Sequence, residues 1–214
     1  MSKMLFIGIT QRVEKVNSYN ECRDVLDQKL IDWVVQAGFL PVPIPNNLVD
    51  INSSDNQSKM NYWLQNINIH GIVLSGGNDI GIIKERDLTE KYLLSWAEKN
   101  KEPVLGICRG MQMMGVYSGG HLIKVDGHVR TRHEIIRSNK NTDSSPRVVN
   151  SYHNLALENC PKKFDVLAQS EDGHLEAMRH KKLPWEGWMW HPEREEIFCE
   201  IDQEDFKMVM NNEI

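Results

Sequence analysis

An apolar run that ends in a cysteine and passes directly into a helical pattern is the feature that most constrains this chain. The run Val104–Ile107 is followed by Cys108, and Gly110 stands two residues further on. A short apolar run with such an ending is consistent with a buried strand, and a sharp strand-to-helix turn crowds its neighbours or requires positive φ, both of which favour glycine. The pattern therefore predicts a strand, a tight turn and a helix.

Cys108 is a candidate nucleophile because of this position. A helix N-terminus carries a partial positive charge that favours a thiolate over a thiol. The alternative is a buried cysteine that packs as a small hydrophobe, and the local pattern G-x-C-x-G does not decide between the two. The choice depends on whether other segments supply the partners that a catalytic cysteine needs.

The first half of the chain alternates between predicted strands and predicted helices. Alternation of this kind implies a parallel sheet that helices cover on both faces, with its site at the carboxyl ends of the strands. Strands are expected at 4–9, 40–44 (near a sheet edge), 71–75 and 103–108; helices at 22–37, 60–67, 87–100 and from Arg109 onward; polar connections at 11–20 and 46–58.

The second half changes to short segments that lie too close together for strand–helix–strand units. A small antiparallel extension is therefore expected. Its segments are 121–124, 131–136, 147–149 and 166–169, followed by closing strands at 175–178 and 185–190 and a final helix at 202–210. The sequence predicts an α/β fold with a mostly parallel central sheet flanked by helices and a small antiparallel extension, in a single domain over residues 1–214.

Composition excludes several classes of protein. The net charge of −5 argues against general nucleic-acid binding. No apolar run approaches the length of a bilayer span, and the first ten residues lack the features of a signal peptide, so we expect a cytoplasmic protein that does not contact membranes. The four cysteines include no C-x-x-C pair, so neither a disulfide framework nor a metal site is expected, and no cofactor is indicated.

A catalytic cysteine needs a base, and His191 is the strongest candidate. The aromatic segment 185–190 predicts a strand that delivers His191 to a strand end, and the Glu193 carboxylate can accept its N–H and raise the basicity of the other nitrogen. Local sequence supports a helix start equally well, with Pro192 at the first position and Glu193 in the first turn. His153 is the rival base, but no carboxylate stands near it in sequence, so we place it on the substrate side.

Four segments carry a stronger signal together than any one of them does alone. They are 75–79 (SGGND), 106–112 (GICRGMQ), 150–153 (NSYH) and 191–193 (HPE). In order and spacing they resemble the class I glutamine amidotransferase-like hydrolases, and within that superfamily the stand-alone γ-glutamyl hydrolases of the C26 peptidase group. The resemblance implies a flavodoxin-like amidotransferase fold and cleavage of a γ-glutamyl amide through a glutamyl thioester.

The same resemblance assigns roles to individual residues. It implies Cys108 as nucleophile, His191 as base and acid, and Glu193 as the group that orients the imidazole. The backbone amides of Gly77 and Arg109 would form the oxyanion hole. A solvated helix face is the alternative for Gln112. The residues implied to contact the glutamyl substrate are Gly76, Asn78, Gln112, Ser151, Tyr152 and His153.

A group of basic residues suggests what the leaving group is. Arginine and lysine are the usual partners of phosphate oxygens, so the group predicts a phosphorylated or nucleotide-linked substrate. The alternative is the solvated face of an exposed strand, because charges of opposite sign alternate over 130–134. We call Lys124, Arg130, Arg132 and Arg137 the basic lobe.

Two other functions remain open at this point. The chain could be a glutaminase subunit that delivers ammonia to a synthetase, in which case its activity should require that partner. It could also hydrolyse another small γ-glutamyl amide, in which case a nucleotide should not matter.

Overall fold

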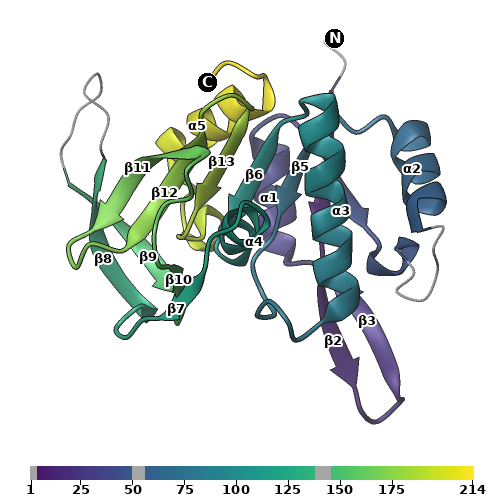
Figure 1. The fold of residues 1–214 in the computed structure, drawn as a ribbon, viewed down its shortest axis with the longest axis horizontal. Coiled ribbons are helices and arrows are strands. Elements are labelled where there is room, and N and C mark those ends of the chain that lie inside the picture. Colours follow the sequence, from purple (N-terminus) through teal and green to yellow (C-terminus); the bar gives the residue numbers. More distant parts are fainter. Residues whose placement is uncertain (1–3, 50–55, 138–145) are drawn as a thin grey trace.

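A mixed sheet of nine strands, ordered β4-β1-β5-β6-β13-β12-β11-β8-β9, forms the centre of the computed structural model, which describes residues 4–49, 56–137 and 146–214 (Figure 1). Neighbours among its first five strands pair in parallel. These strands are β4 (Leu40–Ile44), β1 (Phe6–Thr10), β5 (Gly71–Leu74), β6 (Val104–Ile107) and β13 (Trp185–Trp188). The proline-containing β4 lies at the sheet edge, as expected, because proline has no N–H to donate to a second neighbour.

The antiparallel part is larger than the small extension expected from the sequence. It continues the central sheet beyond β13 and supplies the remaining strands of that sheet, β12 (Leu175–His180), β11 (Phe164–Ser170), β8 (Val129–Arg137) and β9 (Arg147–Tyr152). A separate short pair joins β7 (Leu122–Lys124) to β10 (Leu155–Leu157). The predicted fold class is confirmed, with the antiparallel strands inside the main sheet.

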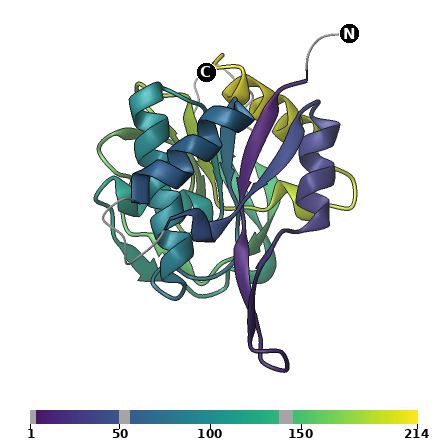
Figure 2. The same cartoon turned by 90° about the vertical axis from the view of Figure 1, so that its right-hand side faces the viewer.

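Helices cover both faces of the parallel half (Figure 2). On one face, α1 (Gln28–Gln36) and α5 (Glu200–Met210) bury Trp33 and Phe206 against Val73 of β5. On the other face, α2 (Asn56–Ile67), α3 (Lys84–Asn100) and α4 (Arg109–Tyr117) pack against Ile72 and Leu74. Neighbouring residues of β5 thus enter opposite cores, which explains its continuous apolar sequence.

Residues 12–25 differ from the prediction of a polar loop and the start of a helix. They form a hairpin of β2 (Arg12–Val16) and β3 (Glu21–Val25) that projects from the body of the molecule (Figure 1). The helix α1 begins only after Asp27, whose side chain accepts a hydrogen bond from the Lys29 amide at 3.0 Å, as an N-cap does.

Two further expectations concern segments outside these elements. The predicted polar connection at 46–58 includes the 3-10 helix η1 (Asn46–Leu48) and the start of α2, while its residues 50–55 lie outside the described part of the chain. None of the described helices is both long and apolar enough to cross a membrane.

Candidate active site

Cys108 lies between β6 and α4 in a backbone conformation that few side chains adopt, with φ 50° and ψ −104°. Its amide donates to the Trp188 carbonyl of β13 at 2.7 Å, and its carbonyl accepts the first helical hydrogen bond from Gln112 at 3.1 Å. Such a conformation costs about 1–3 kcal/mol and persists only where the surroundings impose it. The turn places the thiol at the carboxyl edge of the parallel strands.

The two glycines beside Cys108 serve close packing rather than positive φ. A Cβ atom on Gly110 would lie 2.1 Å from the Leu74 carbonyl oxygen of β5. A Cβ atom on Gly106 would lie 2.6 Å from the Gly110 carbonyl carbon. The first turn of α4 therefore rests directly on the sheet, and the positive φ belongs to Cys108 itself.

His191 and Glu193 form a buried pair next to this turn. Nδ1 of His191 lies 2.6 Å from Oε1 of Glu193, and both side chains are at least nine-tenths buried. The strand end and the helix start considered for His191 are both present. His191 follows β13, and Pro192 and Glu193 lie in the first turn of the 3-10 helix η2 (Pro192–Arg194). With Nδ1 bound to the carboxylate, Nε2 is the nitrogen left for chemistry.

The imidazole of His191 holds its proton at neutral pH. Burial by itself lowers the pKa of His191, but the negative charges of Glu193 and of Cys108, together with hydrogen bonds to both, raise that pKa to about 9. The arrangement therefore provides a protonated imidazole in contact with Cys108, which is the partner that a cysteine nucleophile needs.

This charge state predicts a pH dependence. We expect kcat/KM to fall as pH rises through about 9, because His191 then loses the proton that it must give to the leaving group. The folded-state pKa lies above the ordinary value of 6.5, so the contribution of His191 to stability should be complete below that value and vanish as pH rises through about 9. A pH profile of kcat/KM checks this, and in Glu193→Gln the basic limb should move to lower pH.

Asn150 of β9 holds the backbone of His191, although the sequence analysis did not assign it a role. Its side-chain amide donates to the His191 carbonyl at 2.8 Å and accepts from the His191 amide at 2.9 Å. The same amide donates to Glu195 at 2.7 Å. A buried asparagine in the middle of a strand is the signal that could have revealed it, because strands disfavour asparagine unless its amide has partners.

A buried charged network supports the loop that contains Gly76 and Gly77. Arg86 of α3 donates to the carbonyls of Ser75 at 2.7 Å and Gly76 at 2.9 Å, and its Nε lies 3.0 Å from Glu90. The side chain of Arg109 pairs with Asp87 and Glu90, which also belong to α3. The charges of two cations and two anions thus balance behind the loop. The i,i+4 spacing of Arg86 and Glu90 is the signal in the sequence that could have revealed this pair.

The residues expected to form the oxyanion hole flank this network. Gly77 has φ 112°, and a Cβ atom there would lie 3.0 Å from both Arg12 Cβ and Arg86 Nη1. Arg109 is the first residue of α4, immediately after Cys108. Gly76 packs on His191, because a Cβ atom there would lie 2.6 Å from the imidazole Cε1.

The expected substrate residues divide into those beside His191 and those with other partners. The Tyr152 ring meets the His191 ring edge to face at 5.6 Å between centroids. Gln112 is buried and donates to the Leu155 carbonyl at 2.8 Å, which excludes the solvated helix face considered for it. Ser151 is also buried and donates to the His128 carbonyl at 2.8 Å.

Asn78 and His153 use their polar atoms elsewhere. The Asn78 side chain binds the amide and the carbonyl of Val13, at 2.8 and 3.0 Å, and so fastens the hairpin to the loop. Nδ1 of His153 lies 3.2 Å from the Leu155 carbonyl, and its Nε2 lies 3.4 Å from Glu176.

Two members of the basic lobe have different acidic partners. Arg132 is paired with Glu195 at 3.0 Å and Arg137 with Asp205 at 2.8 Å. These arginines are five residues apart on β8, so they lie on opposite faces of the strand. Arg132 is the member that is connected to the site, because Glu195 also binds Asn150. Arg132 and Arg137 therefore do not act together, and phosphate binding by the members of the basic lobe stays a prediction.

Comparison with known proteins agrees with this geometry. The profile of the Peptidase C26 family matches residues 6–193. The chain belongs to this family. Members are hydrolases of amide bonds, so the predicted enzyme class and the resemblance to C26 hydrolases are confirmed.

Individual relatives give a finer view. The chain is 34% identical to γ-glutamyl-CDP-amidate hydrolase of Campylobacter jejuni, over 89% of this chain and 91% of that protein. It is 32% identical to component 2 of the anthranilate synthase of Cyanophora paradoxa, over 61% of this chain and 70% of that protein. A crystal structure of a glutamine amidotransferase from Thermotoga maritima aligns with a TM-score of 0.63 and 15% identity, covering 99% of this chain and 84% of that chain, and it supports the fold alone.

Proposed function

We propose that this protein hydrolyses a nucleotide-linked γ-glutamyl amide, γ-glutamyl-CDP-amidate, to glutamate and cytidine diphosphoramidate. The observation that carries the proposal is the near-full-length similarity to the Campylobacter enzyme of that name. The buried His191–Glu193 pair beside Cys108 supports it, because hydrolysis through a thioester needs these groups together.

Acylation begins with attack of the Cys108 thiolate on the γ-carbonyl carbon. The carbonyl oxygen becomes an oxyanion, which the amides of Gly77 and Arg109 would stabilise. His191 then donates its proton to the departing nitrogen, the carbon–nitrogen bond breaks, and the amidate leaves. The products of this half-reaction are a glutamyl thioester on Cys108 and a neutral imidazole.

Deacylation reverses the role of His191. Its neutral Nε2 takes a proton from water as the water oxygen attacks the thioester carbon, and the same oxyanion site is used again. Collapse of the intermediate breaks the carbon–sulfur bond, releases glutamate and restores thiolate and imidazolium. Glu193 holds the ring in one orientation throughout.

Substitutions of His191 and of Glu193 should differ in their effects on kcat. We expect His191→Ala to lower kcat by about 10⁴-fold or more and Glu193→Gln by less, because glutamine still accepts from Nδ1 but carries no charge to stabilise the imidazolium. Steady-state kinetics of both variants checks this order. If His153→Ala removed the chemical step and His191→Ala kept it, the assignment of the base would be wrong.

Recognition of a nucleotide should depend on Arg132. Its guanidinium is about half exposed, adjoins the site through Glu195 and could exchange that carboxylate for a phosphate. We expect Arg132→Ala to lower kcat/KM for the nucleotide-linked amide about tenfold to hundredfold, and to leave hydrolysis of a small neutral γ-glutamyl amide unchanged. Arg137→Ala is the matched control, since it removes an ion-paired arginine from the other face of β8. If Arg132→Ala changed kcat/KM for both substrates by the same factor, phosphate binding by Arg132 would be contradicted.

The proposed function is tested by assaying the purified chain alone for glutamate release. γ-Glutamyl-CDP-amidate should be the best of a panel that also holds glutamine and small γ-glutamyl amides. If the chain prefers a small γ-glutamyl amide, that amide would replace the nucleotide-linked amide as the proposed substrate. Activity on glutamine that appears only when a synthetase is added would instead support the glutaminase alternative, for which the similarity to the anthranilate synthase component is the supporting observation.

A further inference from the structure

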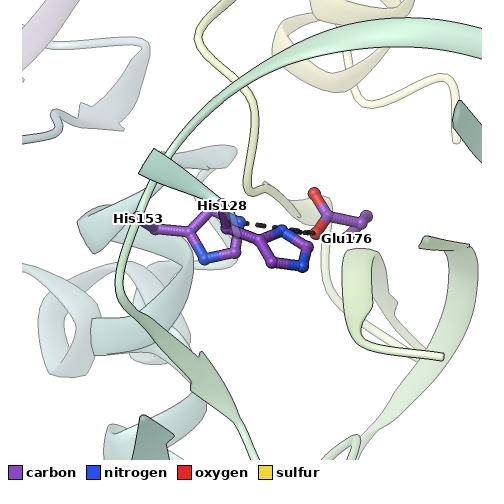
Figure 3. A group of neighbouring side chains, drawn as sticks. All are labelled: His128, His153 and Glu176. Carbon is purple, nitrogen blue, oxygen red and sulfur yellow. Dashed lines mark ion pairs between the residues drawn. The ribbon is translucent and has the colours of Figure 1, made fainter. Parts of the chain in front are cut away.

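A second cluster of buried polar side chains lies in the antiparallel half, outside the Cys108 site (Figure 3). His128 immediately precedes β8, His153 immediately follows β9, and Glu176 belongs to β12; their exposed fractions are 4%, 3% and 1%. His133 of β8 adds a third imidazole, which also faces the Glu176 carboxylate. The proposed hydrolysis gives these side chains no chemical step.

The distances within this cluster are longer than those of ordinary hydrogen bonds. Oε1 of Glu176 lies 3.7 Å from His128 Nδ1 and 3.4 Å from His153 Nε2, and Oε2 lies 3.4 Å from His133 Nε2. Among the described residues, none of these nitrogen and oxygen atoms has a hydrogen-bond partner, and all are buried. Buried polar atoms without partners are costly, so their convergence in one place requires an explanation.

The other nitrogens of two of these rings are already occupied. Nε2 of His128 lies 2.9 Å from the Asp172 carboxylate, and Nδ1 of His153 lies 3.2 Å from the Leu155 carbonyl. Carboxylate and carbonyl oxygens only accept, so these ring nitrogens carry the hydrogens. In the neutral imidazoles, the lone pairs of the remaining nitrogens therefore point at the Glu176 carboxylate, and one bound metal ion would satisfy them together.

The spacing fits a single bound metal ion. Ligand bonds of 2.0–2.2 Å in a tetrahedral zinc site place neighbouring ligand atoms about 3.3–3.6 Å apart, close to the distances seen here. The facing atoms of His128, His153 and Glu176 all lie within 4.8 Å of one another. The carboxylate on the far nitrogen of His128 and the carbonyl on that of His153 are also the usual supports for a metal-bound histidine.

We propose that His128, His153 and Glu176 bind one divalent transition-metal ion, with Zn²⁺ as the best match to two imidazoles and a carboxylate. This replaces the expectation of no metal site, which rested on the spacing of the cysteines alone. The exposed trio of His128, Asp172 and His174 is the weaker candidate, because the Asp172 carboxylate is half exposed and water can satisfy it.

The ion would fasten the segments that form one wall of the active site. The His128 carbonyl accepts from both the Ser151 hydroxyl and the His153 amide, at 2.8 and 2.9 Å. The Glu176 carbonyl accepts from the Met189 amide at 2.8 Å, two residues before His191. A metal ion at Glu176 thus joins the end of β9 to the strand that leads to the proposed base.

The experiment measures metal in the protein as purified, independently of catalysis. Protein prepared without chelators should contain about one equivalent of zinc by elemental mass spectrometry. Removal with dipicolinate should lower the melting temperature, and ZnCl₂ alone should restore it. Added Co²⁺ should give the visible absorption of a tetrahedral nitrogen–oxygen site. Absence of retained metal together with no change in melting temperature on adding Zn²⁺ would overturn the proposal and leave the histidines as protonated partners of Glu176.

Variants locate the ion. His128→Gln and Glu176→Gln should weaken Zn²⁺ binding by about 100-fold or more, and Asp172→Asn, which removes the charge that supports His128, by about 10–100-fold. His174→Gln and His121→Gln should bind as the wild type does. Loss of zinc in His174→Gln with retention in Glu176→Gln would overturn the assignment in favour of the exposed trio. If a ligand variant fails to fold, the Co²⁺ spectrum of the wild type still decides whether nitrogen and oxygen ligands of this cluster bind the metal.

Discussion

Replacing Cys108 by alanine is expected to abolish turnover while the protein stays folded. The thiolate supplies the covalent route, and the remaining groups only bind and polarise the substrate, so kcat should fall by about 10⁴–10⁶-fold. The fold should persist, because the backbone of Cys108 is held by hydrogen bonds to β13 and α4 that the substitution keeps. Glutamate release and thermal unfolding measure the two expectations.

Cys160→Ala is the matched control for this experiment. Its thiol is half-buried and free, and it belongs to neither β6 nor α4, so activity should match the wild type. Residual activity near the wild-type rate in Cys108→Ala would exclude Cys108 as the nucleophile. In His191→Asn, where deacylation is slowed, an activated substrate should leave a glutamyl adduct on Cys108 that mass spectrometry detects.

Replacing Glu90 by glutamine is expected to cause the largest loss of stability. Glu90 is fully buried, accepts from Thr10 at 2.9 Å, and pairs with both Arg86 and Arg109. Burial lowers the pKa of Arg86, and the charge of Glu90 opposes that effect. Glutamine would leave two buried guanidinium groups facing Asp87 alone, so the free energy of unfolding should fall by about 3–5 kcal/mol in denaturant titrations.

Glu98→Gln provides the comparison for Glu90→Gln on the same helix. Glu98 is partly exposed and pairs with the exposed Lys163, so its substitution should change the free energy of unfolding by less than about 1 kcal/mol. Equal stabilities of the two variants would show that the buried network contributes no more than a surface pair. Because Arg86 binds the carbonyls of Ser75 and Gly76, Glu90→Gln should also lower kcat more than Glu98→Gln does.

The parallel half of the fold and the three proposed catalytic residues could be predicted from the sequence because their signals are local. A strand buried on both faces is apolar throughout, as 71–74 and 104–107 are, and no other element is needed to recognise it. Cys108 is marked by the turn that it occupies, and His191 and Glu193 are two residues apart. Neighbours in sequence were thus enough to propose this site.

The hairpin at residues 12–25 could not be predicted because its strands are largely exposed and lack an apolar face. Only its pairing with itself and its hydrogen bonds to Asn78 identify these residues as strands. The extent of the antiparallel half was missed for a related reason. Short strands do not encode which neighbour they pair with, since backbone hydrogen bonds are the same for every sequence.

The sequence alone determined the class of fold and the family, and it was enough to propose the nucleophile with its local partners, since each depends on residues near one another in the chain. Only the tertiary structure decided which charges meet. It paired Arg109 with Asp87 and Glu90, separated Arg132 from Arg137, and brought the histidines at β8 and at the end of β9 to Glu176 of β12. Such contacts join residues about 20 to 50 positions apart, and their energies depend on burial and distance, which no local pattern records.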